Sequence, residues 1–145
     1  MSRTFVSVSR RIPADAQTLF DIVADPARHA EFDGSGSVRA GDGDNPDRLA
    51  LGARFGMAMK IVADYHMDNT VTEFVEGRRI GWRPATGHTW RYLFEPVDGG
   101  TLVTEQWDAR GTKRSWLPVL LGFPRRNRTN ITRTLARLEQ VVAED

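Results

Sequence analysis

The sequence predicts an α+β fold in which a curved antiparallel sheet is covered on one face by a long C-terminal helix. Between residues 53 and 109, short segments of alternating apolar and polar residues follow one another with tight turns between them, as antiparallel strands do. Further on the period changes, because apolar residues recur every three or four positions, at Ile131, Leu135, Leu138 and Val142. The helices are grouped towards the ends of the chain, which favours α+β over an alternating α/β arrangement.

The first third of the chain is predicted to hold one strand and two short helices. Residues 4–12 alternate between apolar and polar side chains, which indicates a first strand. Asp15 can cap the helix that follows, and the aspartate–proline pair at 25–26 ends it, because the residue before a proline leaves the helical region. We expect a second helix over 26–31. Residues 33–52 are rich in Gly, Asp, Asn and Pro, which is typical of a loop, with one short strand near Ser37–Ala40.

Five further strands and a terminal helix are predicted in the rest of the chain. The expected strands are 54–60, 65–75, 79–84, 88–95 and 101–109. Asp98–Gly100 is a strong hairpin turn before the last of them. Trp116–Pro124 contains two prolines and a glycine, so we expect a broken helical turn or a flap there. The helix after it is the only element long enough to cover the apolar face of the sheet.

The composition describes one domain, residues 1–145, and excludes several classes of site. The chain has no cysteine, and its three histidines are not in paired ligand spacing, so we expect neither a metal nor a cofactor. The net charge of +1 gives no reason to expect a nucleic-acid partner. No apolar run approaches the roughly 18 residues that span a bilayer, and the N-terminus is not a signal peptide. We therefore expect a cytoplasmic protein, either a monomer or, through an exposed sheet edge, a homodimer.

Three stretches of the chain resemble the SRPBCC (START-like) proteins, and specifically their polyketide cyclase/dehydrase group. These stretches are Ile12–His29, Thr89–Glu105 and Thr134–Glu139, and their order covers nearly the whole chain. One position departs from the family's pattern: where the second helix usually closes on a tryptophan, this chain has Phe32. Phenylalanine keeps the apolar bulk and loses the indole donor.

The resemblance implies a helix-grip fold, with about seven strands wrapped around the long helix and a deep cavity between them. Members of the family bind lipids, sterols, polyketides or other apolar molecules, and a minority catalyse cyclisation, dehydration or hydrolysis in the cavity. The fold alone does not choose among these functions.

The candidate ligand-binding residues face inward from the sheet and the last helix. Most are aromatic residues or methionines, which suit a flat, partly polar ligand, because methionine adapts to irregular contents and Tyr and Trp carry a polar tip. The alternative is that they simply fill the core. The candidates are Phe55, Met57, Met59, Tyr65, Met67, Trp82, Trp90, Tyr92, Phe94, Glu105, Trp107, Leu121, Ile131 and Leu135.

Glu105 is the candidate catalytic residue. If it lies on the apolar face of its strand, its carboxyl points into the cavity, where burial raises the pKa and suits a general acid or base. Otherwise it pairs with an arginine such as Arg83 or Arg91, or lies in solvent. Asp108 is a weaker candidate of the same kind, and His29 is expected at the surface or at the rim of the pocket.

The segment between residues 109 and 138 carries eight basic residues and no acidic one. This basic segment is either a solvated rim or a surface for an anionic membrane or another partner.

The sequence leaves three candidate functions. The favoured one is binding of a small hydrophobic or aromatic molecule of lipid-, sterol- or polyketide-like kind. The others are a cyclase-, aromatase- or dehydratase-type enzyme using Glu105, and a membrane-surface or regulatory protein using the basic face 110–137.

Overall fold

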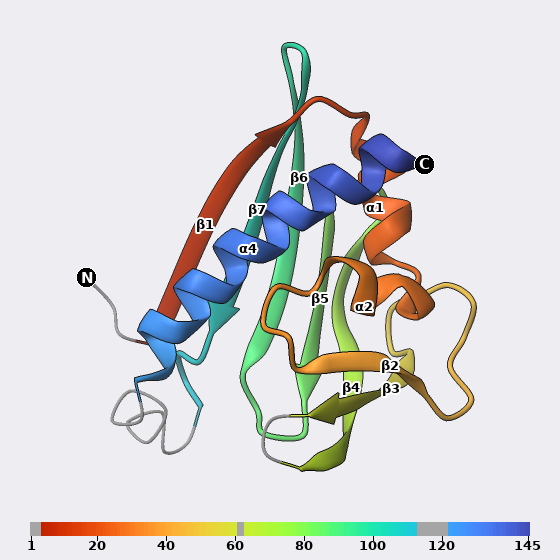
Figure 1. Ribbon diagram of the computed structural model, residues 1–145, viewed down its shortest axis with the longest axis vertical. Coiled ribbons are helices and arrows are strands. Elements are labelled where there is room, and N and C mark those ends of the chain that lie inside the picture. The colour runs from red at the N-terminus through yellow and green to blue at the C-terminus, as the bar shows by residue number, and fades with distance from the viewer. Residues whose placement is uncertain (1–3, 61–62, 113–121) are drawn as a thin grey trace.

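The computed structural model describes residues 4–60, 63–112 and 122–145, which form one seven-stranded antiparallel sheet with a long helix lying across it (Figure 1). The spatial order of the strands is β1-β7-β6-β5-β4-β3-β2, so the first and last strands of the chain are neighbours. The strands are β1 (Phe5–Ile12), β2 (Val38–Asp42), β3 (Arg54–Lys60), β4 (Asp64–Val75), β5 (Arg79–Pro84), β6 (Thr89–Val97) and β7 (Gly100–Asp108). The helices are α1 (Ala16–Val23), the 3₁₀ turn η1 (Pro26–Arg28), α2 (His29–Phe32) and α4 (Phe123–Glu144). The predicted α+β class and helix-grip arrangement are confirmed.

Helix α1 begins where the sequence predicts its cap, and η1 begins at a second aspartate cap that the sequence analysis did not predict. The Asp15 carboxylate accepts hydrogen bonds from the backbone N–H groups of Gln17 and Thr18, at 3.1 and 3.3 Å, at the start of α1. Asp25 caps η1 in the same way, through the N–H of Ala27 at 3.0 Å. These two caps fix the path of the chain from β1 to α2.

Helix α4 is longer than the apolar repeat predicts. It begins at Phe123, directly after Gly122, whose φ of +76° suits a residue without a Cβ. The break expected over Trp116–Pro124 is therefore wrong at its C-terminal end. Pro124 lies in the first turn, where its missing N–H breaks no helical hydrogen bond. Residues 116–121 lie outside the described residues, so the broken turn or flap there stays a prediction.

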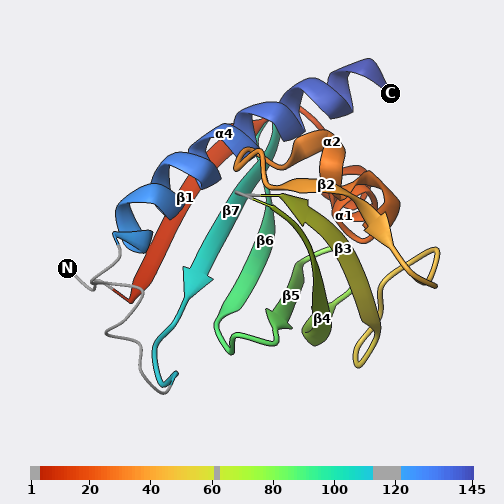
Figure 2. The same cartoon turned by 60° about the horizontal axis from the view of Figure 1, so that its bottom comes forward.

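Helix α4 lies over one face of the sheet (Figure 2). The core fills one end of the space between them. Phe20 of α1 makes edge-to-face contacts with Phe74 and Phe94, with ring centroids 5.5 and 5.6 Å apart. Leu135 and Leu138, on the C-terminal half of α4, are fully buried. The C-terminal half of α4 is therefore packed against apolar side chains. Its N-terminal half lies over a part of the interior that this core does not fill.

The opposite face of the sheet carries an ion-pair network. Arg91 contacts Glu73 at 2.7 Å and Asp108 at 3.1 Å, and Asp108 also contacts Arg110 at 3.0 Å. Hydrogen bonds from Arg110 lower the pKa of Asp108 to about 2, so this carboxylate stays ionised at neutral pH. Asp108 is thus a structural anion rather than the weaker acid–base candidate that the sequence suggested. Arg91 is occupied by this network and is not the partner of Glu105.

Candidate functional site

A cavity of about 650 Å³ lies between the sheet and the N-terminal half of α4. Its volume is in the range of small-molecule sites. Eleven of the fourteen candidate residues line it: Phe55, Met57, Met59, Tyr65, Met67, Trp82, Trp90, Tyr92, Glu105, Trp107 and Ile131. The alternation along each strand therefore brings together residues from five strands, β3 to β7.

The other three candidates lie elsewhere. Phe94 and Leu135 are buried but do not line the cavity. Phe94 is the next inward-facing residue of β6 after Tyr92, and Leu135 lies about one helical turn after Ile131 on α4. At that end the core around Phe20 already fills the space. Leu121 is outside the described residues.

The centre of the aromatic wall is Trp82 of β5. Its ring is stacked on His29 with centroids 5.0 Å apart, and Phe55 and Tyr92 contact it at 5.5 and 5.6 Å. Phe32, at the position where the family usually has tryptophan, lies 6.3 Å from Tyr92 and lines the same cavity. These rings form broad apolar surfaces that hold one another in place.

Glu105 lies in the middle of β7, opposite Tyr92 of β6, and its side chain is buried at 5% exposure. Its Oε1 atom has no hydrogen-bond partner among the described residues. Burial raises the pKa of Glu105 well above its usual range, a hydrogen bond with Tyr92 lowers it, and the nearby charge of Asp33 raises it further. The environment therefore favours the protonated form of the carboxyl, and its Oε1 has no partner in the described part of the chain although Glu105 lines the cavity.

Two histidines belong to the cavity wall: His29, which the sequence placed at the surface or at the pocket rim, and His88, which it did not assign to the site. His29 is buried rather than at the surface, and its Nε2–H donates to the carbonyl of Val23 at 2.8 Å. Burial lowers its pKa to about 4. His88 also lines the cavity, and burial together with the charge of Arg83 lowers its pKa to about 4. Both rings are neutral at pH 7, so they act there as aromatic walls with polar nitrogens.

Helix α4 contributes polar residues that the apolar repeat conceals. Asn127, Asn130 and Thr134 line the cavity with Ile131. Their spacing of three or four residues is the same helical signal that identified the apolar face, extended by one turn towards the N-terminus. The helical spacing would have predicted these polar residues if the inward face of the helix had not been defined by apolar residues alone.

Two cations border the cavity, Lys60 at the end of β3 and Arg126 in the first turn of α4. Both are exposed, and the Arg126 guanidinium lies over the Phe123 ring at 4.4 Å. The cavity thus has an apolar interior and a basic border.

A family model described as "Polyketide cyclase / dehydrase and lipid transport" matches residues 3–143. The chain belongs to this family. The resemblance to SRPBCC proteins that the sequence showed is confirmed by this match. The family and the fold together support a ligand-binding or cyclase-type function.

Known relatives of this family member share its fold. The chain is 38% identical over 144 residues to an uncharacterized protein of Mycobacterium tuberculosis, covering 95% of this chain and 64% of the relative. It therefore spans less than two thirds of that relative's length. A crystal structure of a protein from Nitrosomonas europaea superposes with a TM-score of 0.76 at 16% identity, covering 99% of this chain and 97% of that one. A polyketide cyclase-like protein from Corynebacterium glutamicum gives 0.64 at 22% identity, covering 97% and 91%.

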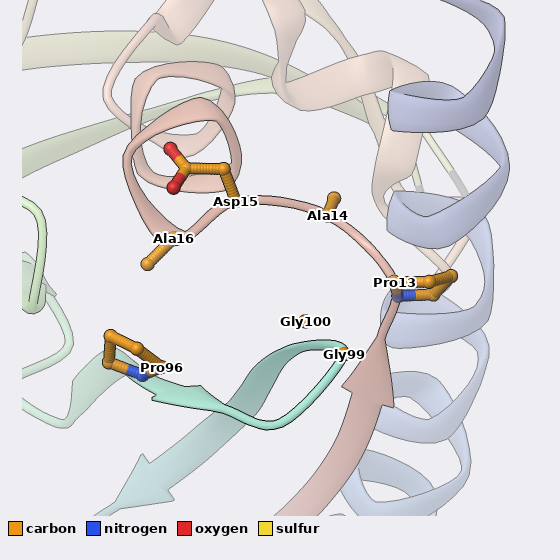
Figure 3. Close-up of a pocket in the computed structure, with 7 residues that line it drawn as sticks. All are labelled: Pro13, Ala14, Asp15, Ala16, Pro96, Gly99 and Gly100. Atoms are coloured by element: carbon orange, nitrogen blue, oxygen red, sulfur yellow. The ribbon is translucent and has the colours of Figure 1, made fainter.

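A second, open depression of about 350 Å³ lies on this polyketide cyclase/dehydrase domain where β1 meets α1 (Figure 3). Pro13, Ala14, Asp15, Ala16, Pro96, Gly99 and Gly100 line it. Asp15 is the one charged residue among these seven, and its carboxylate already caps α1.

The basic segment is only partly described. Arg110 pairs with Asp108, and Arg137 donates to the backbone carbonyl of Asp33. Lys113 and Arg114 lie outside the described residues. The remaining members are exposed arginines on α4: Arg125, Arg126, Arg128 and Arg133. Its role as an interaction face stays a prediction.

The described residues contain no group of three His, Asp or Glu side chains that could hold a metal ion. His66 and Asp68, which share a strand face, contact each other at 2.5 Å. No described helix is long and apolar enough to cross a membrane.

Proposed function

We propose that this protein binds a small hydrophobic or aromatic molecule, of lipid-, sterol- or polyketide-like kind, between its sheet and α4. The observation that carries the proposal is the cavity of about 650 Å³ with an aromatic and methionine wall. A chain that used these residues only as core would close the space, because protein interiors are normally close-packed. A ligand that covers the wall gains about 25 cal/mol for each Å² of apolar surface removed from water.

The cavity wall contains both rigid aromatic side chains and flexible methionine side chains. Trp82 and Tyr92 are held by their ring contacts, so they define the shape of the site. Met57, Met59 and Met67 line the neighbouring strands β3 and β4, and their flexible thioether chains adjust to ligands of different outline. The Glu105 carboxyl and the Tyr92 hydroxyl give the ligand one polar point of orientation.

The test is a fluorescence titration with N-phenyl-1-naphthylamine, a neutral aromatic probe, using the emission of Trp82, Trp90 and Trp107 as the protein signal. We expect saturable binding of one probe per chain. Met59→Trp, which adds bulk inside the cavity, should weaken binding about tenfold or more. Val75→Trp is the matched control, because Val75 is 54% exposed and does not line the cavity. It should leave the affinity unchanged.

Two results would overturn this proposal. One is an affinity that Met59→Trp leaves as it was, since the probe would then sit elsewhere. The other is the absence of saturable binding for the probe, for oleate, for cholesterol and for a flavonoid, together with a protein that leaves its own host without a bound small molecule in native mass spectrometry.

A second candidate function is catalysis, and the observation that favours it is the buried Glu105 carboxyl, whose Oε1 has no partner among the described residues and whose pKa is raised by burial. In its protonated form this carboxyl can donate a hydrogen bond to a ligand carbonyl and so favour enolisation, in which a solvent water takes the proton from the α-carbon. The test is proton–deuterium exchange at the α-carbon of 2-tetralone, followed by NMR. Glu105→Gln should lower the exchange rate while keeping the affinity for 2-tetralone. A protein that never exceeds the buffer rate is a binding protein for this ligand.

A further inference from the structure

We propose that the molecule held in this cavity carries a positively charged amine, and that Glu105 and Asp33 are the groups that select it. This inference rests on the proposed function, because it names the chemical class of the ligand in the same cavity. It follows from the charges, the ring faces and the one unpaired oxygen of the interior.

The two acidic residues of the cavity lining, Glu105 and Asp33, are buried and half-buried, whereas the two cations of the lining are exposed. The charge of Asp33 acts on Glu105 and on Tyr92. The Asp33 carboxylate accepts hydrogen bonds from the Ser35 hydroxyl at 2.6 Å and from the Val38 N–H at 3.4 Å, and neither donor is charged. Neither carboxyl forms an ion pair among the described residues, and the cation beside Asp33, Arg137, donates to the Asp33 backbone carbonyl. The two cations that line the cavity, Lys60 and Arg126, are exposed at its border.

The aromatic lining suits a cation in the same place. Trp82, Tyr92 and Phe55 line the cavity from the sheet side, and aromatic rings attract ammonium groups through their quadrupole wherever a face is not already covered, as one face of Trp82 is by His29. Desolvation strengthens this attraction, and these rings are nearly fully buried.

The unpaired Oε1 of Glu105 distinguishes an amine from a neutral donor. A ligand hydroxyl would donate a hydrogen bond to that oxygen. It would leave the charge of Asp33 uncompensated, and that charge would still disfavour ionisation of Glu105. An ammonium group would satisfy the oxygen, compensate the charge of both carboxylates and form a charge-assisted hydrogen bond, which is the stronger kind. A ligand carboxylate would be repelled there by the ionised forms of Glu105 and Asp33. The interior therefore fits an aromatic or hydrophobic amine better than the corresponding alcohol or acid.

The experiment compares three probes of one shape: 2-naphthylmethylamine, 2-naphthalenemethanol and 2-naphthoic acid. Calorimetric titration of the wild-type protein at pH 7.5 should give an affinity for the amine at least about tenfold higher than for the alcohol. The acid should bind weakest. Glu105→Gln should remove most of the amine's advantage and leave the alcohol within about twofold, and Asp33→Asn should act in the same direction.

The affinity for the amine should also rise between pH 5.5 and 8, because Glu105 must lose its proton to pair with the ligand. The other titratable or charged groups that line the cavity are His29, Asp33, Lys60, Tyr65, His88, Tyr92 and Arg126. The two histidines have pKa values of about 4, so they stay neutral over this range. The affinity for the alcohol should not follow this rise.

Glu95→Gln is the matched control, since it removes a carboxylate from an exposed position on β6 that does not line the cavity. It should leave all three affinities as they are. Equal binding of alcohol and amine, or an amine preference that survives in folded Glu105→Gln and Asp33→Asn proteins, would overturn this inference and leave cavity binding intact. If none of these probes and no N-phenyl-1-naphthylamine binds, the proposed function itself fails.

Discussion

Glu105 is costly for the folded protein on its own. It is buried, one of its oxygens has no partner among the described residues, and its other interaction is with Tyr92 across the strand pair. Leaving a buried polar group unsatisfied costs about 1–3 kcal/mol. A residue that weakens the ligand-free fold and faces a cavity is what a binding site requires, because the cost is recovered when a ligand supplies the missing partner.

The first prediction concerns this pair. Replacing both partners by apolar residues, as Tyr92→Phe with Glu105→Met, should raise the free energy of unfolding by about 1–2 kcal/mol. Glu105→Met alone should gain less, since it leaves the Tyr92 hydroxyl without its partner. Urea unfolding at pH 7 measures both. A double variant less stable than the wild type would mean that the pair is already satisfied without a ligand.

The sequence predicted the position of Glu105 but not its neighbours on the helices. The register between β6 and β7 has no bulge, so counting by twos along β7 was enough to turn Glu105 inward. His29 could not be placed in this way. Its burial depends on how η1 and α2 fold back over the sheet and on the hydrogen bond to Val23, and a single histidine in a polar stretch carries no periodic signal of that contact.

At the scale of the elements, α4 has two roles that change at Thr134. Towards the C-terminus Leu135 and Leu138 pack in the core, and towards the N-terminus Asn127 and Ile131 roof the cavity. At this boundary the loop after α2 contacts the helix directly. A Cβ on Gly34 would lie 2.5 Å from the Thr134 backbone nitrogen, so only glycine permits the contact.

The second prediction tests that contact. The Gly34 N–H donates to the Thr134 hydroxyl at 2.8 Å, and both residues are buried. Thr134→Val keeps the shape and leaves a buried N–H unpaired, which should lower the free energy of unfolding by about 1–3 kcal/mol. Thr132→Val is the matched control on the same helix, because its exposed hydroxyl bonds only the Arg128 carbonyl. The control should change stability by less than about 0.5 kcal/mol. Equal effects in chemical denaturation would show that the contact contributes nothing.

The strands were the most predictable elements and the start of α4 the least. Strands 54–60 and 79–84 were predicted with their observed ends, and the other strands differ by one or two residues at one or both ends. Alternation is a property of every residue in a half-buried strand, which is why it survives local irregularity such as the bulge between Val71 and Glu73. The start of α4 is set by one left-handed glycine and a tolerated proline, and the same residues also occur in broken turns.

At the scale of the whole molecule, the ionisable groups give the fold a definite response to acid. His29 is buried and its pKa falls from 6.5 to about 4 on folding, so folding favours its neutral form. The raised pKa of Glu105 acts in the opposite direction, because folding favours its protonated form. His88 has the same sign as His29, and the carboxylates of the ion-pair network lose their contribution only below their ordinary pKa values.

The third prediction isolates His29 from these opposing groups. Above pH 6.5 the ring is neutral in both the folded and the unfolded chain, and its contribution to stability is complete. As the pH falls from 6.5 towards 4, the unfolded chain takes up a proton that the folded chain refuses, so the free energy of unfolding decreases. The loss approaches about 1.4 kcal/mol per pH unit and about 3 kcal/mol in all. His29→Gln keeps a donor for the Val23 carbonyl and removes the titration, so the stability of this variant should fall less over this pH window, whatever its value at pH 7.

Urea unfolding of both proteins at pH 7.0, 5.5 and 4.5 gives the comparison. The effects of Glu105 and His88 on stability cancel in it, because both proteins contain these residues. Parallel profiles would mean that His29 is protonated in the folded state without cost. Its burial would then not lower its pKa as described above.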